Sequence, residues 1–593
     1  MSDDGRRIPE LAAGRRPAGR ALLGWLDDVQ APLLCRVAGS AGSGRSHLLA
    51  WLVLACTSAA TPAGQRVHAV LPAAGVTADS AAWLLGGQLG VVARAPADVL
   101  AAVAQDGRRT VICVPELSLA ADPGALVAEL LAPLLRMPGV RLVVEASEGT
   151  PEAAALTAVA APAVLDLDDP QWTDRARYEA WCAAERADPS AYPSPGAALA
   201  AAGRQPSPPP VVERLADLLA LVPGGPPELL AAGPGLLSRV WAAAAREGAP
   251  ASLAADPLLL VHGDPLAVTA ALAGLAAPTT VSAAWAEAGP ALAGEDDPAV
   301  RAAVLRSRLL GRDDAAAARL DPPQAGWQGV WARWRTGAVA ALSTGCGPYA
   351  GQLLVADPDG AVRAVLAGTG QPQGTVVVPG PKPLRALTVT PGGSVLLLDA
   401  WGAAAIVAPD RPAEGFEPYA LGAALDGLRA VAGAGLTVLA AAPELPGAGP
   451  AAGDAAGGVH WSEDGRVTSR ELHHGPVTAL AATADGGVPL LVSGGLDGAV
   501  RLWGPDSEPM AEPSDRRHVP VTAVAAGLTA AGLAVAAAWA DGLVRVRRLT
   551  GDGRALDFRP GSPVHALAFA DGLLAVGLPD GLLAVRADGG AAR

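Results

Sequence analysis

The sequence predicts a multidomain protein with an N-terminal α/β domain, a helical middle region and a C-terminal all-β propeller. Its 593 residues are too many for one hydrophobic core. Two patterns separate the parts: apolar strands alternate with helical segments early in the chain, and a strand-rich repeat fills its last part. We expect a flexible arm over 1–18, the α/β domain over 19–170, a linker and helical domain over 171–325, and the propeller over 326–593.

The N-terminus is rich in arginine and has no apolar segment of the kind that signal peptides contain. A solvated arm is therefore favoured over a contact with an acidic partner. The apolar runs that follow are LLCRVAG, RVHAVLPA, RTVICVPE and VRLVVEAS, each separated from the next by helical sequence. Short buried strands between helices indicate a parallel sheet with both faces covered.

A glycine-rich stretch, VAGSAGSGRS, joins the first of these strands to the next helix. Its spacing fits loops in which glycines let backbone N–H groups close on phosphate at a helix N-terminus. Such loops have lysine where this chain has Arg45, and the hydroxyl of Ser46 is of the type that ligates Mg²⁺. The candidate residues for ATP or GTP with Mg²⁺ are Gly39, Gly42, Gly44, Arg45, Ser46 and Glu116.

The carboxylates that hydrolysis requires are incomplete. One acid must position Mg²⁺ and another must orient the attacking water, yet the strand VICVPE ends in Pro115 and Glu116. The strand after it, VRLVVEASEG, ends in Glu145 and Glu148, and acids there repel a γ-phosphate. An active NTPase, nucleotide binding without turnover and a purely structural loop all stay open. The pattern favours the last, and it indicates no catalytic residue.

The middle of the chain combines a linker with helices. Residues 187–210, ADPSAYPSPGAALAAAGRQPSPPP, are rich in Pro, Ser and Ala, which favours a loop or linker over a packed element. From 211 to about 320 the apolar residues recur with helical spacing.

A short apolar segment recurs in the last part of the chain. Its copies VAALST, LRALTV, LRAVAG, VTALAA, VTAVAA and VHALAF begin at Val339, Leu384, Leu428, Val477, Val521 and Val564. A period of about 40–45 residues with Asp-Gly turns is typical of propeller blades. The last copy holds about three strands, so we expect GVWARWR, residues 329–335, to complete that blade. This arrangement gives six blades, with seven as the second choice.

Charge and cysteine content narrow the partners. The net charge of −14 argues against general nucleic-acid binding. The five cysteines are odd in number and form no C-x-x-C pair, which favours reduced thiols in a cytoplasm over disulfides or a metal site. No apolar run is suited to spanning a membrane.

The loop and the repeats together resemble bacterial STAND-type P-loop NTPases that carry a C-terminal WD-repeat propeller. AGRALLGWLDD, residues 18–28, is similar to the Gly-Arg box that precedes the phosphate loop in that family. In the clearest repeat, HHGPVTALAATADGGVPLLVSGGLDGAVRLW, the resemblance places four residues in the structural hydrogen-bond network of a blade: His474, Ser493, Asp497 and Trp503.

The resemblance also carries an expectation about function. It implies a degenerate NTPase-like domain joined by a helical connector to a WD-repeat-like propeller. Protein partners would bind the propeller or its junction with the helical domain, as expected of a non-catalytic scaffold or sensor. The alternative is a signalling switch driven by ATP or GTP, with weak or partner-stimulated hydrolysis.

Overall fold

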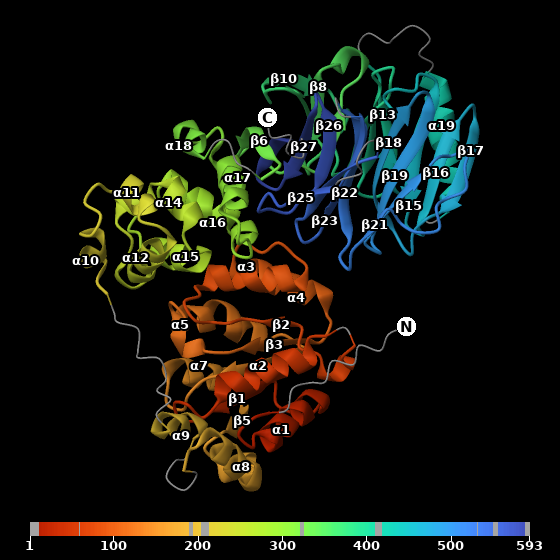
Figure 1. Cartoon of the computed structure of the whole chain (residues 1–593). Coiled ribbons are helices and arrows are strands. Elements are labelled where there is room, and N and C mark those ends of the chain that lie inside the picture. Colours follow the sequence, from red (N-terminus) through yellow and green to blue (C-terminus); the bar gives the residue numbers. More distant parts are fainter. Residues whose placement is uncertain are drawn as a thin grey trace. The chain divides into compact units, whose positions relative to one another are not determined.

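The computed structural model describes residues 11–58, 60–188, 194–202, 213–320, 325–409, 418–433, 435–529, 532–549 and 555–587 (Figure 1). The chain divides into two compact units, residues 1–282 and 283–593. The division falls inside one helix of the middle region, so the last helices before the propeller belong to the same unit as the propeller. Residues 1–10 of the expected arm lie outside the described residues.

The first unit contains the parallel sheet that the sequence predicts. Its five strands follow the order β2-β3-β4-β1-β5. They are β1 (Leu34–Ala38), β2 (Ala69–Val70), β3 (Thr110–Val114), β4 (Val140–Glu145) and β5 (Pro162–Asp166). Both β3 and β4 are buried along their whole length, as expected of central strands with helices on both faces.

Two hydrophobic clusters cover the two faces of this sheet. Val111, Cys113 and Val143 pack on one face against α1 and α2, whereas Ile112 and Leu142 pack on the other against α3 and its neighbours. This alternation follows from the two-residue period of a strand. The helices of this region are α1 (Arg16–Asp27), α2 (Arg45–Cys56), α3 (Ala78–Leu89), α4 (Pro96–Asp106), α5 (Pro123–Leu126), α6 (Ala132–Leu135), α7 (Pro151–Val159), α8 (Arg175–Glu185) and α9 (Pro195–Ala201). Short helical turns are η1 (Ala63–Gln65), η2 (Leu117–Leu119), η3 (Val127–Leu131) and η4 (Pro170–Trp172).

The middle region is helical, as predicted. Its helices are α10 (Leu215–Leu219), α11 (Pro226–Ala231), α12 (Pro234–Glu247), α13 (Ala251–Ala254), α14 (Pro257–His262), α15 (Pro265–Ala273), α16 (Thr280–Leu292), α17 (Pro298–Leu309) and α18 (Asp314–Arg319). Three Asp-Pro pairs start helices here. Asp256, Asp264 and Asp297 each accept a backbone N–H of the following helix. The proline after each aspartate takes the first helical position, where its missing N–H has no cost.

Six antiparallel sheets form the predicted propeller. Each inner strand contacts the inner strand of the next blade, and β26 contacts β7, which closes the ring. Blade 1 consists of β7 (Ala341–Thr344), β8 (Gln352–Ala356), β9 (Val362–Leu366) and β10 (Pro372–Val376). Blade 2 consists of β11 (Leu384–Val389), β12 (Val395–Asp399) and β13 (Ala404–Val407). Blade 3 consists of β14 (Leu436–Ala440), β15 (Ala448–Asp454), β16 (Gly458–Glu463) and β17 (Arg466–Glu471).

Blades 4 to 6 complete the ring. Blade 4 consists of β18 (Val477–Asp485), β19 (Val488–Gly495), β20 (Ala499–Trp503) and β21 (Asp515–Arg516). Blade 5 consists of β22 (Val521–Thr529), β23 (Gly532–Trp539), β24 (Val544–Arg548) and β25 (Ala555–Phe558). Blade 6 consists of β26 (Ala566–Ala570), β27 (Leu573–Leu578) and β28 (Gly581–Arg586), together with β6 (Gln328–Trp334). A helical turn, η5 (Gly347–Tyr349), follows β7.

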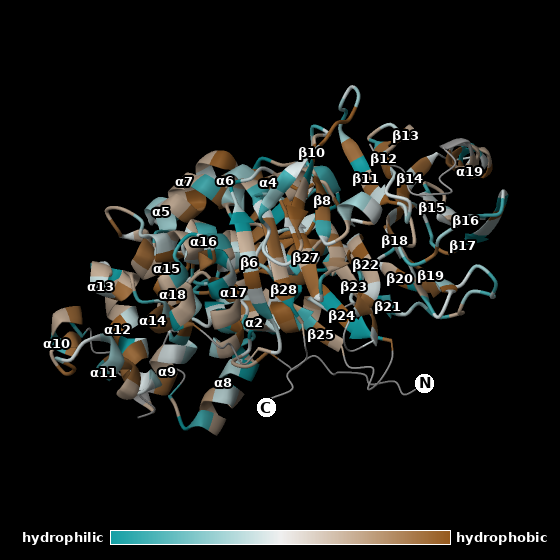
Figure 2. Cartoon of the chain, turned by 90° about the horizontal axis from the view of Figure 1, so that it is seen from above, coloured by the Kyte–Doolittle hydropathy of each residue, from teal (hydrophilic) through white to brown (hydrophobic). Residues whose placement is uncertain are grey.

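The last blade takes its fourth strand from the beginning of the propeller, as the sequence predicts. Strand β6 pairs antiparallel with β28, with Trp334 opposite Gly581 and Trp331 opposite Ala584. Figure 2 shows that β27 and β28 are mostly hydrophobic, and both are buried over nearly all of their length. Pairing with β6 therefore covers an apolar strand that would otherwise be an open edge.

One of the six predicted repeat positions is wrong. Leu428 lies in a helix, α19 (Pro418–Val431), and the inner strand of that blade begins later, at Leu436. The segment LRAVAG matched the repeat because it is short and apolar. Within α19, however, Leu421, Leu425 and Leu428 have helical spacing, and all three pack in one apolar cluster with strands of blades 2 and 3.

Among the described residues, no helix is both long and apolar enough to cross a bilayer.

Candidate functional site

The glycine loop between β1 and α2 has a backbone that requires glycine. The φ angles of Gly39, Gly42 and Gly44 are 137°, 79° and 94°. Residues other than glycine rarely adopt such angles, so the shape of the loop requires glycine at these three positions. Gly44 is the residue before the first turn of α2, and no side chain caps that helix. The loop therefore presents backbone N–H groups at a helix N-terminus, where an anion is stabilised.

Arg45 and Ser46, two of the candidate residues, both turn toward Glu145. Arg45 Nε lies 3.5 Å from Glu145 Oε1. The Ser46 hydroxyl lies 3.1 Å from Oε2 and 3.3 Å from Oε1 of the same carboxylate. Register explains the convergence, because β1 is paired with β4 and Val37 lies opposite Glu145.

Glu116 joins this group through its backbone. Its N–H donates to Glu145 Oε2 over 3.3 Å, and its φ of 56° turns the chain immediately after β3 and Pro115. The Glu145 carboxylate thus accepts hydrogen bonds from the Ser46 hydroxyl and the Glu116 N–H, and it also pairs with the Arg45 guanidinium. Its residue is 6% exposed. Sequence analysis predicted that Glu145 repels phosphate, but it did not predict these three contacts.

A buried arginine supports the loop from the N-terminal segment, which corrects the expectation of a flexible arm up to residue 18. Arg15 is 3% exposed, and its guanidinium donates to the carbonyls of Ser43 (2.7 Å) and Leu167 (2.8 Å) and to Thr173 Oγ1 (2.7 Å). Charge at the N-terminus suggested solvation, but buried carbonyls accept hydrogen bonds from both terminal nitrogens of this guanidinium. Arg20 of the predicted Gly-Arg box is exposed on α1 instead.

The outer side of the loop is also covered. Ser40 donates its N–H and its hydroxyl to the Asp168 carboxylate over 2.6 and 2.9 Å. The N–H of Gly196, in α9, donates to the Gly42 carbonyl over 2.8 Å, and a Cβ on Gly42 would lie only 2.9 Å from Gly196 Cα. Helix α9 lies inside the segment predicted as an unpacked linker, and Ala198 in it is fully buried. That part of the linker prediction is wrong.

The structural network of blade 4 uses a different histidine from the expected one. His473 bridges Asp497 Oδ1 (Nδ1, 3.1 Å) and Ser493 Oγ (Nε2, 2.8 Å). His474 contributes only its backbone N–H, which donates to Asp497 Oδ2 over 3.2 Å. Trp503 is buried, but its indole N–H donates to the Ser507 carbonyl instead of joining this network. The resemblance pointed to the correct dipeptide and to the wrong member of it.

Burial sets the charge state of this network. Desolvation lowers the pKa of His473, against the opposing effect of Asp497. Burial disfavours the charged form of Asp497, but hydrogen bonds from the Ala499 N–H and His473 outweigh it and lower the pKa of that carboxyl. Ser493 is 1% exposed. The Ser493 hydroxyl is therefore closed to solvent and engaged by His473.

Blade 3 contains a second network that sequence analysis missed. His460 contacts Asp454 Oδ2 through Nε2 (2.9 Å) and Ser469 Oγ through Nδ1 (2.8 Å). Asp454 Oδ1 also accepts the N–H groups of three turn residues, Ala456, Gly457 and Gly458. The available signal was an aspartate at the end of one strand and a histidine in the next, but the serine partner comes from strand pairing.

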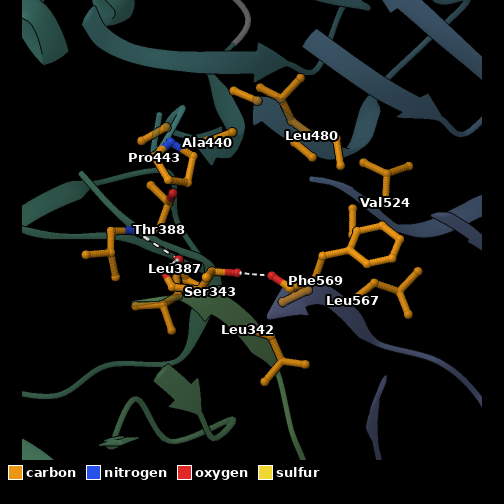
Figure 3. Close-up of a pocket in the computed structure, with 18 of the residues that line it drawn as sticks. Leu342, Ser343, Leu387, Thr388, Ala440, Pro443, Leu480, Val524, Leu567 and Phe569 are labelled. Atoms are coloured by element: carbon orange, nitrogen blue, oxygen red, sulfur yellow. Dashed lines mark hydrogen bonds between the residues drawn. The ribbon is translucent and has the colours of Figure 1, made fainter. Parts of the chain in front are cut away.

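The centre of the propeller holds only a small cavity, of about 100 Å³ (Figure 3). Inner strands of all six blades line it, with apolar side chains such as Leu342, Leu387 and Val524. Two of its hydroxyls are engaged: Thr344 Oγ1 donates to the Phe569 carbonyl over 2.6 Å, and Ser343 Oγ accepts an N–H from blade 2. Ligand pockets typically measure about 300–1,000 Å³. The central cavity is smaller than that.

Comparison with known proteins gives only fold-level likeness. Two solved structures, titled "Crystal structure of RRP9 WD40 repeats" and "Structure of U3-55K", each share 14% identity with this chain at a TM-score of 0.28. Each match covers 44% of this chain and 98% or 99% of the other. No family model matches the chain, and no curated protein does. Strand pairing is therefore what defines the multidomain class: a parallel α/β sheet, a helical region and a six-bladed propeller.

Proposed function

We propose that this protein is a non-catalytic protein–protein interaction scaffold or sensor whose propeller, or the junction of the propeller with α17 and α18, binds protein partners. Trp401 is the observation that carries the proposal. It is 73% exposed, in the turn between β12 and β13. Tryptophan is strongly enriched among the residues that dominate binding energy at protein interfaces.

Trp401 occupies a position that other blades give to an aspartate. Asp497 and Asp541 hold it in blades 4 and 5, where each accepts a backbone N–H of its own turn. The three turns are equivalent because, in each, the residue before this position donates its N–H to the carbonyl of the proline that precedes the inner strand. The pairs are Ala400 with Pro383, Leu496 with Pro476 and Ala540 with Pro520.

In blade 2 this turn is held by another residue, which leaves Trp401 without a structural task. Asp399 Oδ1 accepts the N–H groups of Trp401 (3.0 Å) and Ala403 (2.8 Å). A polar residue at 401 would therefore serve the fold as well. A tryptophan that the turn does not need is instead the kind of side chain that anchors protein interfaces.

The glycine loop supports the non-catalytic part of the proposal. Arg45 and Ser46, whose equivalents serve nucleotide and metal in phosphate loops, are engaged by Glu145. Pro115 supplies no metal ligand at the end of β3. The proposed compartment is the cytoplasm, because all five cysteines are free thiols.

The test is affinity capture from the native host with the full chain, comparing wild type, Trp401→Ala and Leu54→Ala. Leu54 is an exposed apolar residue of the first unit, 68% exposed on α2, and serves as the matched control. We expect Trp401→Ala to weaken retention of specific partners by about 10-fold or more, as for an interface hot spot. Chemical cross-linking with mass spectrometry locates the contacts of the captured partners. Undiminished capture by Trp401→Ala, with all cross-links in residues 1–282, would contradict the proposal.

The second candidate function is an ATP- or GTP-dependent switch. One observation favours it: the three glycines of the loop keep the positive φ angles that a phosphate-binding loop needs. Partner-stimulated, Mg²⁺-dependent phosphate release would support this function over the scaffold.

A further inference from the structure

We infer that the Glu145 carboxylate is an internal ligand of the glycine loop, which occupies it in place of phosphate and keeps a latent anion site closed. This inference goes beyond the scaffold function. It concerns the first unit, so its failure and the failure of partner binding by the propeller are separate results.

The contacts of Glu145 are those an incoming phosphate would need. Phosphate loops use a basic side chain and a Ser or Thr hydroxyl at the start of the helix to hold terminal phosphates and their metal. Here the Arg45 guanidinium and the Ser46 hydroxyl both contact Glu145. The other end of the guanidinium donates to Ser147 Oγ over 2.8 Å, which fixes Arg45 on the end of β4.

A second, independent feature of the loop is a buried hydroxyl that lacks a hydrogen-bond partner in the part of the chain that the structure describes. Ser43 is fully buried, and among the described residues its hydroxyl has no hydrogen-bond partner. Its Oγ would lie 2.6 Å from a Cβ on Gly39, so the hydroxyl points across the loop to its first residue. A buried donor without an acceptor is costly, and a phosphate oxygen is such an acceptor.

Electrostatics explains why one carboxylate is enough to exclude phosphate. Two like charges about 5 Å apart, at the effective dielectric of a protein surface, weaken binding by roughly 100-fold. Glu145 also removes the cation that would offset this repulsion, because Arg45 is already paired. Without the Glu145 carboxylate, the Arg45 guanidinium and the Ser46 hydroxyl lose their common acceptor, beside an N-terminus of α2 that no side chain caps.

The experiment measures binding of inorganic pyrophosphate and of Mg-ATP to the full chain by isothermal titration calorimetry. The variants are Glu145→Ala and Glu145→Gln, the second of which keeps the side-chain size and an acceptor for the Ser46 hydroxyl. Glu148→Ala is the control: Glu148 is the second acid that the sequence places near the phosphate, but it is exposed, so solvent and salt screen its charge. Circular dichroism shows whether each variant is folded.

We expect wild type and Glu148→Ala to show no binding of pyrophosphate at about 1 mM. Both Glu145 variants should bind it with a Kd at least about 10-fold below that concentration. Pyrophosphate should also raise the melting temperature of Glu145→Gln and leave that of wild type unchanged. Wild-type binding as tight as that of the variants would overturn the inference. So would a folded Glu145→Gln that binds pyrophosphate no better than wild type.

Discussion

Replacing Arg308 with alanine tests whether helix α17 is part of the closed propeller. Arg308 is completely buried, and its guanidinium donates to Asp580 Oδ2 (2.9 Å) and to the Pro560 carbonyl (3.0 Å). It also lies over the Trp334 ring, 4.5 Å from the centroid. Trp334 is the last residue of β6, and Asp580 lies in the turn before β28, so this arginine joins the two strands that close the ring.

The expected loss of stability is large. Removing the buried partner of an ion pair costs about 3–5 kcal/mol, and Arg308→Ala also removes the hydrogen bond to the Pro560 carbonyl and the contact with the Trp334 ring. For a unit of this size, 1 kcal/mol corresponds to about 2 °C in melting temperature, so the propeller should melt about 6–10 °C lower. Arg470→Ala is the control, since Arg470 pairs with Glu508 over 3.0 Å at an exposed position of the propeller, away from the closing strands. Exposed pairs contribute about 1 kcal/mol or less.

Differential scanning calorimetry of the full chain measures the melting temperatures, and hydrogen exchange locates the change. In Arg308→Ala we expect faster exchange of the β6 amides than in wild type, with the β18–β19 pair affected much less. A decrease below about 2 °C, equal to that expected of Arg470→Ala, would refute the reasoning. Faster exchange spread evenly over all blades would also refute it, because it would show that α17 does not act at the closure.

Three further predictions concern the rest of the chain. Neither wild type nor Arg45→Lys should release phosphate from ATP or GTP, because Pro115 still leaves the metal without a ligand; Mg²⁺-dependent turnover of roughly 1 s⁻¹ or more would contradict this. Burial lowers the pKa of His68, His473 and His565 below the ordinary 6.5, so the unfolded chain binds protons first, and calorimetry should show stability falling as the pH drops through 6.5. Burial raises the pKa of Cys35 and Cys113 to about 12, so mass spectrometry after iodoacetamide treatment at pH 8 should find both thiols labelled only in unfolded protein.

The propeller could be predicted because its signal is periodic. Strand, turn and strand recur along the chain, and incomplete pairing in the last copy pointed to residues 329–335 as the closing strand. Local errors arose where one apolar pattern fits two structures. LRAVAG at Leu428 reads as a strand in isolation, but the leucines before it give it a helical period in α19. The sequence therefore predicts the number of blades more reliably than the start of each one.

The identity of the network histidine could not be predicted, because two histidines are adjacent. Both histidines lie in a bend between β17, which ends at Glu471, and β18, which begins at Val477. In this bend the His473 imidazole reaches Ser493 and Asp497, whereas His474 contributes its backbone N–H. The path of the chain through such a bend has no periodic signal in the sequence.

The function of the α/β domain depends on strand order, which a single sequence does not contain. Glu116 was the acidic candidate because its strand stands where a metal-binding acid is expected in the chain. In the sheet, however, β4 lies between β1 and β3, so the carboxylate beside the glycine loop is that of Glu145. Sequence analysis had assigned Glu145 only a repulsive effect on phosphate. Both effects have one cause: a carboxylate close enough to repel a phosphate is close enough to bind Arg45 and Ser46 in its absence.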